Sequence, residues 1–175
     1  MDRLSKNLRQ IKNILKIYNI KLILAGGAVL GYYRSGDFIP WDKDVDLFLT
    51  YEDLYPCVDQ IMHDMKVKGF KLKLIDGYGS LKIIGRKQGM KYELTSYVND
   101  GTWYYRKKDG INTAFIPMHF NDNLQIIELR KISYYVPEDI EGYLKYMYKD
   151  WKTPCRGKLK DYSSNDYIRM ENENT

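Results

Sequence analysis

Three aspartates alternate with other residues where one apolar segment begins, and this pattern constrains the fold of the chain more than any other feature. Asp42, Asp44 and Asp46 occur in the segment PWDKDVDLFL. In an extended chain, residues two apart point to the same side and lie about 6.6–6.8 Å apart along the backbone. We therefore expect a strand over 44–49 that carries Asp44 and Asp46 on one face and apolar side chains on the other. Asp42 continues the spacing backwards, on the preceding loop or the strand edge.

Carboxylates that share one strand face need a counter-charge, and this need indicates a function. Two carboxylates ~4 Å apart repel each other by roughly 4 kcal/mol at an effective dielectric constant near 20. A hard divalent cation removes this repulsion, and Mg²⁺ is commonly held by one or two carboxylates together with substrate phosphates. Asp44 and Asp46 are therefore predicted to bind Mg²⁺, or Mn²⁺ in its place, for chemistry at a phosphodiester or pyrophosphate bond. The alternative is solvated charge at the entrance of a strand, because D-x-D alone is a weak motif.

A pair of glycines lies upstream of the acidic segment. Gly26 and Gly27 follow an apolar, strand-like segment over 21–25 and precede a segment of helical composition over 28–34. Glycine lets a backbone approach a phosphate closely, and the start of a helix offers free N–H groups and positive potential. The pair therefore fits a phosphate-binding turn, and fits equally a tight turn without a ligand.

The rest of the chain alternates between helical and extended patterns. Apolar residues at helical spacing, with lysine and arginine between them, predict an amphipathic helix over 5–18. We expect further helices over 54–67 and 140–148, strands over 71–75, 80–84 and 91–98, and a hairpin over 124–129 and 132–136. Segments 35–43 and 100–110 are expected to be loops. The aromatic and basic residues of WYYRKK, 103–108, could suit single-stranded nucleic acid, but a hairpin tip is favoured. This order predicts an α/β (α+β) domain over 1–155 around one mixed sheet flanked by helices, followed by a polar tail over 156–175.

The composition fits one soluble domain in the cytoplasm. The 175 residues are 44% hydrophobic and 29% charged, with a net charge of +5. This modest, scattered excess fits a phosphate-bearing partner without requiring one, and a nucleic acid is not expected as a partner. Cys57 and Cys155 show no metal-ligand spacing and suit a reducing compartment. His63 and His119 stand alone and are given no catalytic role. The most apolar run, 20–33, is shorter than the roughly 20 residues of a membrane-spanning helix.

Taken together, the glycine turn and the acidic strand resemble a known family. Segment 26–49, GGAVLGYYRSGDFIPWDKDVDLFL, closely resembles the LicD family, which includes the fukutin-related proteins. The family signature reads roughly G-x-x-L-G-x-x-R, a short linker, and I-P-W-D-x-D-h-D, where h is apolar. Every fixed position of that signature is matched here, namely by Gly27, Leu30, Gly31, Arg34, Ile39, Pro40, Trp41, Asp42, Asp44 and Asp46. Weaker similarity extends the resemblance to about 22–154.

The resemblance implies a polymerase-β-like nucleotidyltransferase fold and a specific reaction. A phosphorylated alcohol, such as phosphocholine or ribitol phosphate, would pass from a CDP-activated donor to a hydroxyl of a glycan or small molecule, with CMP leaving. The Tyr92-Glu93-Leu94 segment resembles the family strand that bears a third carboxylate, so Glu93 is a candidate third metal ligand. Two positions depart from the family pattern: Lys43, where Asp or His is common, and Glu93, where Asp is more common. The chain is also short for the family, so acceptor-selecting elements are expected to be absent or supplied by a partner subunit.

The remaining candidate residues each have more than one possible role. Asp42 is a metal ligand, a group that supports the ligands, a base toward the acceptor hydroxyl, or else a loop cap. Arg34 contacts donor phosphate or pairs with Asp42. Lys82 and Arg86 neutralise charge on the transferring phosphorus or are ordinary exposed strand charges. Trp41 stacks on a base or anchors a packed loop.

Two other functions compete with this reaction. The same fold and metal could transfer a nucleotide from a nucleoside triphosphate to a small molecule, a protein or an RNA end. The chain could also be a non-catalytic binding or scaffold member of the family, although the three aspartates argue against this, because unpaired carboxylates are costly to keep together.

Overall fold

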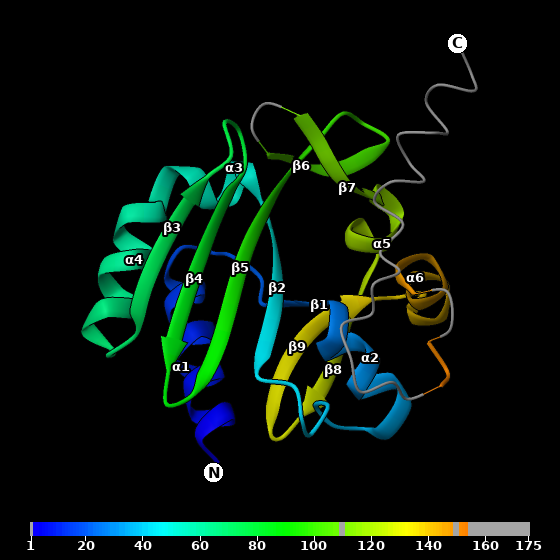
Figure 1. Cartoon of the computed structure of the whole chain (residues 1–175), viewed down its shortest axis with the longest axis horizontal. Coiled ribbons are helices and arrows are strands. Elements are labelled where there is room, and N and C mark those ends of the chain that lie inside the picture. Colours follow the sequence, from blue (N-terminus) through cyan, green and yellow to red (C-terminus); the bar gives the residue numbers. More distant parts are fainter. Residues whose placement is uncertain (1, 109–110, 149–150, 154–175) are drawn as a thin grey trace.

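The computed structural model describes residues 2–108, 111–148 and 151–153 of the chain (Figure 1). Its helices are α1 (Arg3–Ile17), α2 (Gly26–Ser35), α3 (Tyr51–Leu54), the 3₁₀ helix η1 (Tyr55–Cys57), α4 (Val58–Val67), α5 (Met118–Asp122) and α6 (Ile140–Met147). Its strands are β1 (Ile23–Ala25), β2 (Asp44–Thr50), β3 (Lys71–Asp76), β4 (Leu81–Lys87), β5 (Met90–Asn99), β6 (Trp103–Lys108), β7 (Ile111–Pro117), β8 (Leu124–Leu129) and β9 (Ile132–Pro137). The predicted tail over 156–175 lies outside the described residues. No helix in the described part of the chain is both long and apolar enough to cross a membrane.

The strands form one mixed sheet, as the sequence predicts. The main path runs β3-β4-β5-β2-β1-β9-β8, and the β6–β7 hairpin joins it through β5. The β2–β5 and β1–β9 pairs are parallel, and the other pairs are antiparallel. The short strand β1 therefore lies in the middle of the sheet, and Figure 1 shows it beside the start of α2.

Helices α1 and α4 cover one face of the sheet. In α1 the side chain of Asp2 accepts a hydrogen bond from the Ser5 amide and caps the helix start. The apolar stripe predicted for this helix is buried, with Leu8 and Ile11 fully inaccessible to solvent. On the same face, the Asn7 side chain donates a 3.1 Å hydrogen bond to the Tyr92 hydroxyl of β5. Residues of β5 that flank Tyr92, including Glu93, consequently point to the opposite face.

Helices α2 and α6 and the β6–β7 hairpin lie against the opposite face. The Tyr143 hydroxyl of α6 accepts a hydrogen bond of 3.0 Å from the Gly26 amide at the start of α2. Phe48 of β2 stacks on Tyr97 and meets the edge of Tyr104 from the hairpin, with ring centroids 4.7 and 5.0 Å away. These contacts leave a space between the strands β2, β4 and β5, the hairpin and α6.

Three local expectations differ from the structure. The helix expected over 54–67 is broken into α3, η1 and α4, because Pro56 cannot donate a backbone hydrogen bond within a continuous helix. The WYYRKK segment is strand β6 rather than a hairpin tip, because it pairs with both β5 and β7. The strand expected over 80–84 continues as β4 to Lys87 and contains Gly85, where a Cβ would come within 3.0 Å of the Met65 side chain.

Candidate active site

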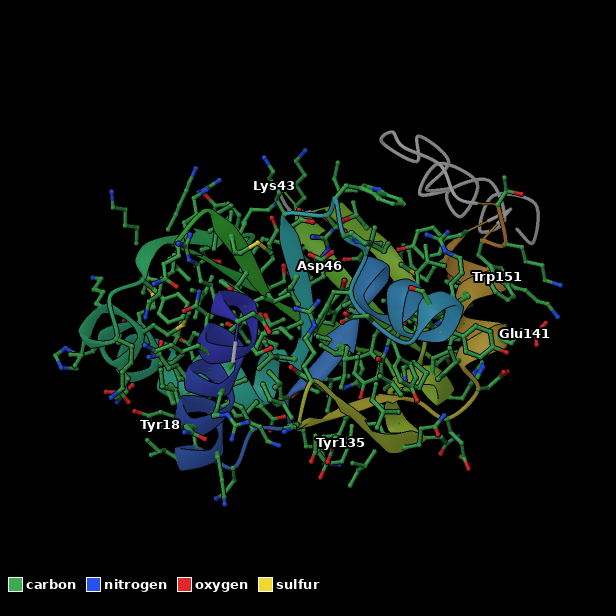
Figure 2. The ribbon with its side chains drawn as sticks, turned by 90° about the horizontal axis from the view of Figure 1, so that it is seen from below. Tyr18, Lys43, Asp46, Tyr135, Glu141 and Trp151 are labelled. Carbon is green, nitrogen blue, oxygen red and sulfur yellow. The ribbon has the colours of Figure 1, made fainter. Side chains whose placement is uncertain are left out.

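The acidic residues of β2 and β5 lie side by side on the face opposite α1. The parallel register pairs Asp44 with Lys91 and Asp46 with Glu93. The alternate residues Val45 and Leu47 are only 2% and 1% exposed, so the two faces of β2 separate as the alternation predicts. Figure 2 shows Asp46 inside the molecule beside α2, whereas Lys43 points outward at its edge.

The glycine pair brings the start of α2 against these carboxylates. At Gly26, whose φ is +54°, a Cβ atom would lie 3.2 Å from Asp46 Oδ2; at Gly27 it would lie 2.9 Å from Asp42 Oδ2. Any larger side chain would therefore push a carboxylate away. Carboxylates at the start of a helix are favoured by its positive end. The glycines thus make room for Asp42 and Asp46, and the Gly26 amide is already bonded to Tyr143.

Two lysines neutralise part of the acidic cluster. Lys91 Nζ lies 2.6 Å from Asp44 Oδ2 and 2.9 Å from Glu93 Oε1, and Lys82 Nζ lies 2.5 Å from Glu93 Oε2. Lys91 therefore bridges two carboxylates that the sequence assigns to a metal, and Lys82 holds the far oxygen of one of them. No ion pair involves Asp42 or Asp46 within the described residues.

The pKa values follow from this unequal sharing of positive charge. Burial, together with the Glu93 and Asp44 charges, raises the pKa of Asp46 to about 6. Burial and its hydrogen bond with Asp44 raise the pKa of Asp42 to about 6. For Asp44 and Glu93, burial acts in the same direction, but their hydrogen bonds and the lysine charges outweigh it and lower the pKa of each. The cluster therefore retains uncompensated negative charge around Asp46 and Asp42 at neutral pH.

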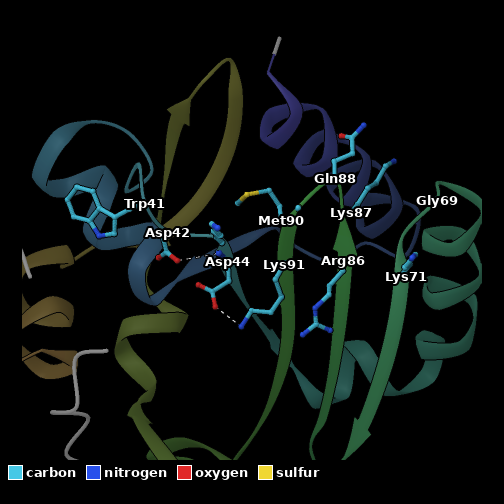
Figure 3. Close-up of a pocket in the computed structure, with 12 residues that line it drawn as sticks. Trp41, Asp42, Asp44, Gly69, Lys71, Arg86, Lys87, Gln88, Met90 and Lys91 are labelled. Carbon is cyan, nitrogen blue, oxygen red and sulfur yellow. Dashed lines mark hydrogen bonds and ion pairs between the residues drawn. The ribbon is translucent and has the colours of Figure 1, made fainter. Parts of the chain in front are cut away.

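The acidic residues separate two cavities. An inner cavity of about 300 Å³ is bounded by β2, β4 and β5, the β6–β7 hairpin and α6, and it exposes Gly26, Asp46, Lys82, Glu93 and Arg106. An open outer groove of about 930 Å³ lies on the other side and is lined by Asp42, Asp44 and Lys91, among others (Figure 3). A ligand in either cavity would reach the carboxylates from a different direction.

Some of the predicted site residues lie next to the acidic residues of β2, and others do not. Lys82 and Glu93 join Asp44 and Asp46, and Trp41 and Arg86 line the outer groove. Arg34 does not join them: it lies in the last turn of α2, eight residues or about 12 Å of helix beyond Gly26. The described residues contain no ion pair between Arg34 and Asp42, and the predicted contact of Arg34 with donor phosphate stays a prediction.

The oxygen donors suit a hard divalent cation, although the cluster is not already arranged as a metal cage. Carboxylates with residual negative charge are the ligands that Mg²⁺ and Mn²⁺ prefer. Nevertheless, across the ranges that the structure describes, no three His, Cys, Asp or Glu side chains are grouped to hold one ion. The Lys91 ammonium stands between Asp44 and Glu93. An ion that used both carboxylates would have to displace this ammonium.

Sequence reasoning missed two residues of the site. Lys91 lies two positions before Glu93, so the period-2 rule could have placed both on one face. Tyr143 left no such signal, because its contact with Gly26 joins residues 117 apart in the sequence.

Comparison with known proteins identifies the family of the chain. The family model of the LicD/FKTN/FKRP nucleotidyltransferase domain matches residues 19–139. The ribitol 5-phosphate transferases FKRP of Mus musculus and Homo sapiens are each 41% identical to this chain over 54 residues, covering 31% of this chain and 11% of theirs. An uncharacterized protein of Caenorhabditis elegans is 31% identical over 77 residues, covering 44% of this chain and 20% of its own. The matched segments therefore span a fifth or less of these relatives.

A solved structure shares the whole fold. The antibiotic-resistance factor ANT(2'')-Ia superposes with a TM-score of 0.57 over 99% of this chain and 98% of its own, at 12% sequence identity. At this identity the likeness concerns the fold alone. It agrees with the mixed sheet flanked by helices and with the matched nucleotidyltransferase domain.

Proposed function

Because the chain belongs to the LicD/FKTN/FKRP nucleotidyltransferase domain family, we propose that it transfers a phosphorylated alcohol from a CDP-activated donor to a hydroxyl of a glycan or small molecule. The observation that carries the proposal is the pairing of Asp46 with Glu93 across β2 and β5, on the wall of a cavity next to the start of α2. The name of the FKRP relatives supports ribitol phosphate as one such group, and phosphocholine is the other candidate.

The proposed reaction is a single displacement at phosphorus. The acceptor hydroxyl oxygen forms a bond to the alcohol-bearing phosphorus of the donor, the bond from that phosphorus to the CMP oxygen breaks, and CMP leaves. The acceptor proton passes to Asp42, whose raised pKa of about 6 keeps it ionised at neutral pH yet basic enough to accept a proton. Lys82 and the start of α2 offset negative charge on the diphosphate.

A divalent ion completes this proposed site. Asp44, Asp46 and Glu93 would hold Mg²⁺ or Mn²⁺, which neutralises phosphate oxygens and strengthens the phosphorus as an electrophile when it is bound. Glycine at 26 and 27 permits the close approach of Asp46 and Asp42 to the start of α2. The carboxylates and the helix amides can therefore contact the same bound ligand.

Calorimetric titration tests this function. CDP, CTP and CDP-choline would be titrated into the protein with and without Mg²⁺, together with the variants Asp46→Asn and Asp59→Asn. Asp59 is an exposed residue of α4 and serves as the charge-matched control. We expect Mg²⁺-dependent binding of CDP and CDP-choline that Asp46→Asn abolishes and Asp59→Asn leaves intact.

The other outcomes each support a different function. Binding of CTP without binding of CDP-choline would favour nucleotidyl transfer from a triphosphate. If no nucleotide binds under any condition, the transferase proposal fails for this chain, and a scaffold role, or a subunit that needs its partner, would replace it.

A further inference from the structure

Three cations lie directly opposite one another on the part of the sheet face that α2, α6 and the β6–β7 hairpin leave uncovered. The antiparallel registers pair Lys71 with Arg86 and Arg86 with Lys91, and the parallel register pairs Lys91 with Asp44. We call Lys71, Arg86 and Lys91 the cation row. The row crosses β3, β4 and β5 in a straight line and ends at the acidic strand β2.

This row is electrostatically unfavourable in the protein alone. Like charges directly opposite each other in a sheet are destabilising. Lys91 is compensated by Asp44 and Glu93, but the side chains of Lys71 and Arg86 form no hydrogen bond or ion pair with any described residue. The next row on the same face, Lys73, Ile84, Glu93 and Asp46, contains a single cation. Positive charge is therefore concentrated in one row rather than spread over the face.

The cation row forms the floor of the outer groove. All three of its residues line this cavity of about 930 Å³, together with Asp42 and Asp44. Figure 3 shows Trp41 at one end of the groove and Lys71 toward the other, with Asp44, Lys91 and Arg86 between them. The Trp41 side chain is 45% exposed and can offer a ring face to a ligand.

We propose that the outer groove binds the acceptor, and that the acceptor carries an anionic group, a phosphate, which Lys71 and Arg86 recognise. This inference rests on the proposed transferase function and adds to it the chemical class of the acceptor. Neighbouring strands are about 4.8 Å apart, so Arg86 lies roughly 10 Å from Asp44 at the backbone. A sugar phosphate can span this distance, with its phosphate over Arg86 and Lys71 and its accepting hydroxyl beside Asp42.

The geometry of displacement places the acceptor in this groove rather than in the inner cavity. In an in-line displacement the attacking and leaving oxygens lie on opposite sides of the phosphorus. The inner cavity holds the start of α2, Lys82 and Glu93, which suit the donor diphosphate. The outer groove opens on the other side of the acidic residues and is the one that Asp42 lines. A proton acceptor is needed on that side.

Binding of glucose 6-phosphate, with glucose as the uncharged match, tests the proposal. Both sugars would be titrated into the ¹⁵N-labelled protein while backbone amide shifts are followed at low ionic strength. We expect glucose 6-phosphate, and not glucose, to shift amides of 86–91. Lys71→Met and Arg86→Met should each weaken this binding about fivefold, the loss expected for one exposed charge-assisted contact. Lys73→Met, on the same strand and face but outside the groove, should leave it unchanged, and Lys71→Arg should restore it.

The results separate this inference from the proposed function. If glucose 6-phosphate fails to shift groove residues, or binds all variants alike, the acceptor assignment is overturned even where CDP still binds with Mg²⁺. The assignment is equally overturned if Lys71→Met and Arg86→Met weaken CDP instead, because the groove would then hold the donor. If CDP does not bind but the sugar phosphate does, the proposed transferase reaction is lost while the anion site remains.

Discussion

Replacing Lys91 with methionine should make the acidic cluster bind a divalent metal ion more tightly. In the wild-type protein, the Lys91 ammonium lies 2.6 Å from Asp44 Oδ2 and 2.9 Å from Glu93 Oε1. A metal that uses both carboxylates must break these contacts and approach a positive charge. Methionine keeps much of the length and apolar character of the side chain but removes the charge, so this competition disappears.

The expected gain follows from the two contacts. A charge pair ~4 Å apart contributes about 4 kcal/mol at an effective dielectric constant near 20. Lys91 and Asp44 are 30% and 35% exposed, so solvent screening reduces this figure. A net value of about 1.5–3 kcal/mol, typical of hydrogen bonds to charged groups, corresponds to roughly 10- to 100-fold tighter metal binding.

Manganese titration without nucleotide measures this effect. Free Mn²⁺ would be followed by electron paramagnetic resonance at neutral pH for the wild-type protein, Lys91→Met, Lys91→Arg and the control Lys73→Met. We expect tighter binding only in Lys91→Met. The same variant should unfold at a lower temperature in a chelator, because Asp44 and Glu93 then repel each other without a cation between them. Equal or weaker Mn²⁺ binding by Lys91→Met would refute the idea that the ammonium occupies the place of a metal.

Three further substitutions test other parts of the site. Because the pKa of Asp46 is raised from 3.8 to about 6, its native carboxyl keeps a proton that the unfolded chain loses, so stability falls as the pH rises between about 4 and 6. Asp46→Asn should therefore stabilise the metal-free protein by roughly 2–3 kcal/mol at pH values above this window and by little below it. Urea unfolding of both proteins below and above the window measures this difference, and a variant less stable than the wild type above the window would contradict the reasoning. Gly31→Ala should destabilise the protein by about 1–3 kcal/mol, since its Cβ would lie 2.7 Å from the Asp37 carbonyl oxygen, and unchanged urea unfolding would contradict this packing. Tyr143→Phe should lower the free energy of unfolding by about 1–3 kcal/mol, because the buried Gly26 amide loses its acceptor. Thermal unfolding measures this loss, and a melting curve equal to that of the wild type would mean that water replaces the hydroxyl.

The acidic strand could be predicted because its signal is local. Alternation over a few residues sets which side chains share a face, and the structure places Val45 and Leu47 in the core and the aspartates on the other side. The mixed sheet also follows from local patterns, since most predicted strands appear within two or three residues of their expected bounds.

The rest of the site depends on contacts that a local pattern does not contain. Glu93 reaches Asp46 through a parallel pairing of strands far apart in the sequence, and a resemblance to known proteins, rather than periodicity, singled it out. The error at WYYRKK has the same origin, because aromatic and basic residues suit an exposed tip as well as a strand that pairs on both sides. The role of Arg34 stays a prediction, and its distance from the glycine turn is set by the length of α2.

The residues of the site favour the native register between β2 and β5 over a shifted one. A slip of β5 by one residue would turn Lys91 and Glu93 toward α1 and bring Tyr92 and Leu94, both fully buried, to the face that now carries the acidic residues. Such a misaligned chain would bury two charged side chains away from Asp44 and Lys82 and move two large apolar side chains out of the core, so it would compete poorly with the native state. The charges of Lys91 and Glu93 therefore also disfavour misaligned pairing of β5. A variant that neutralises them is expected to be less selective among alternative strand alignments as well as less active.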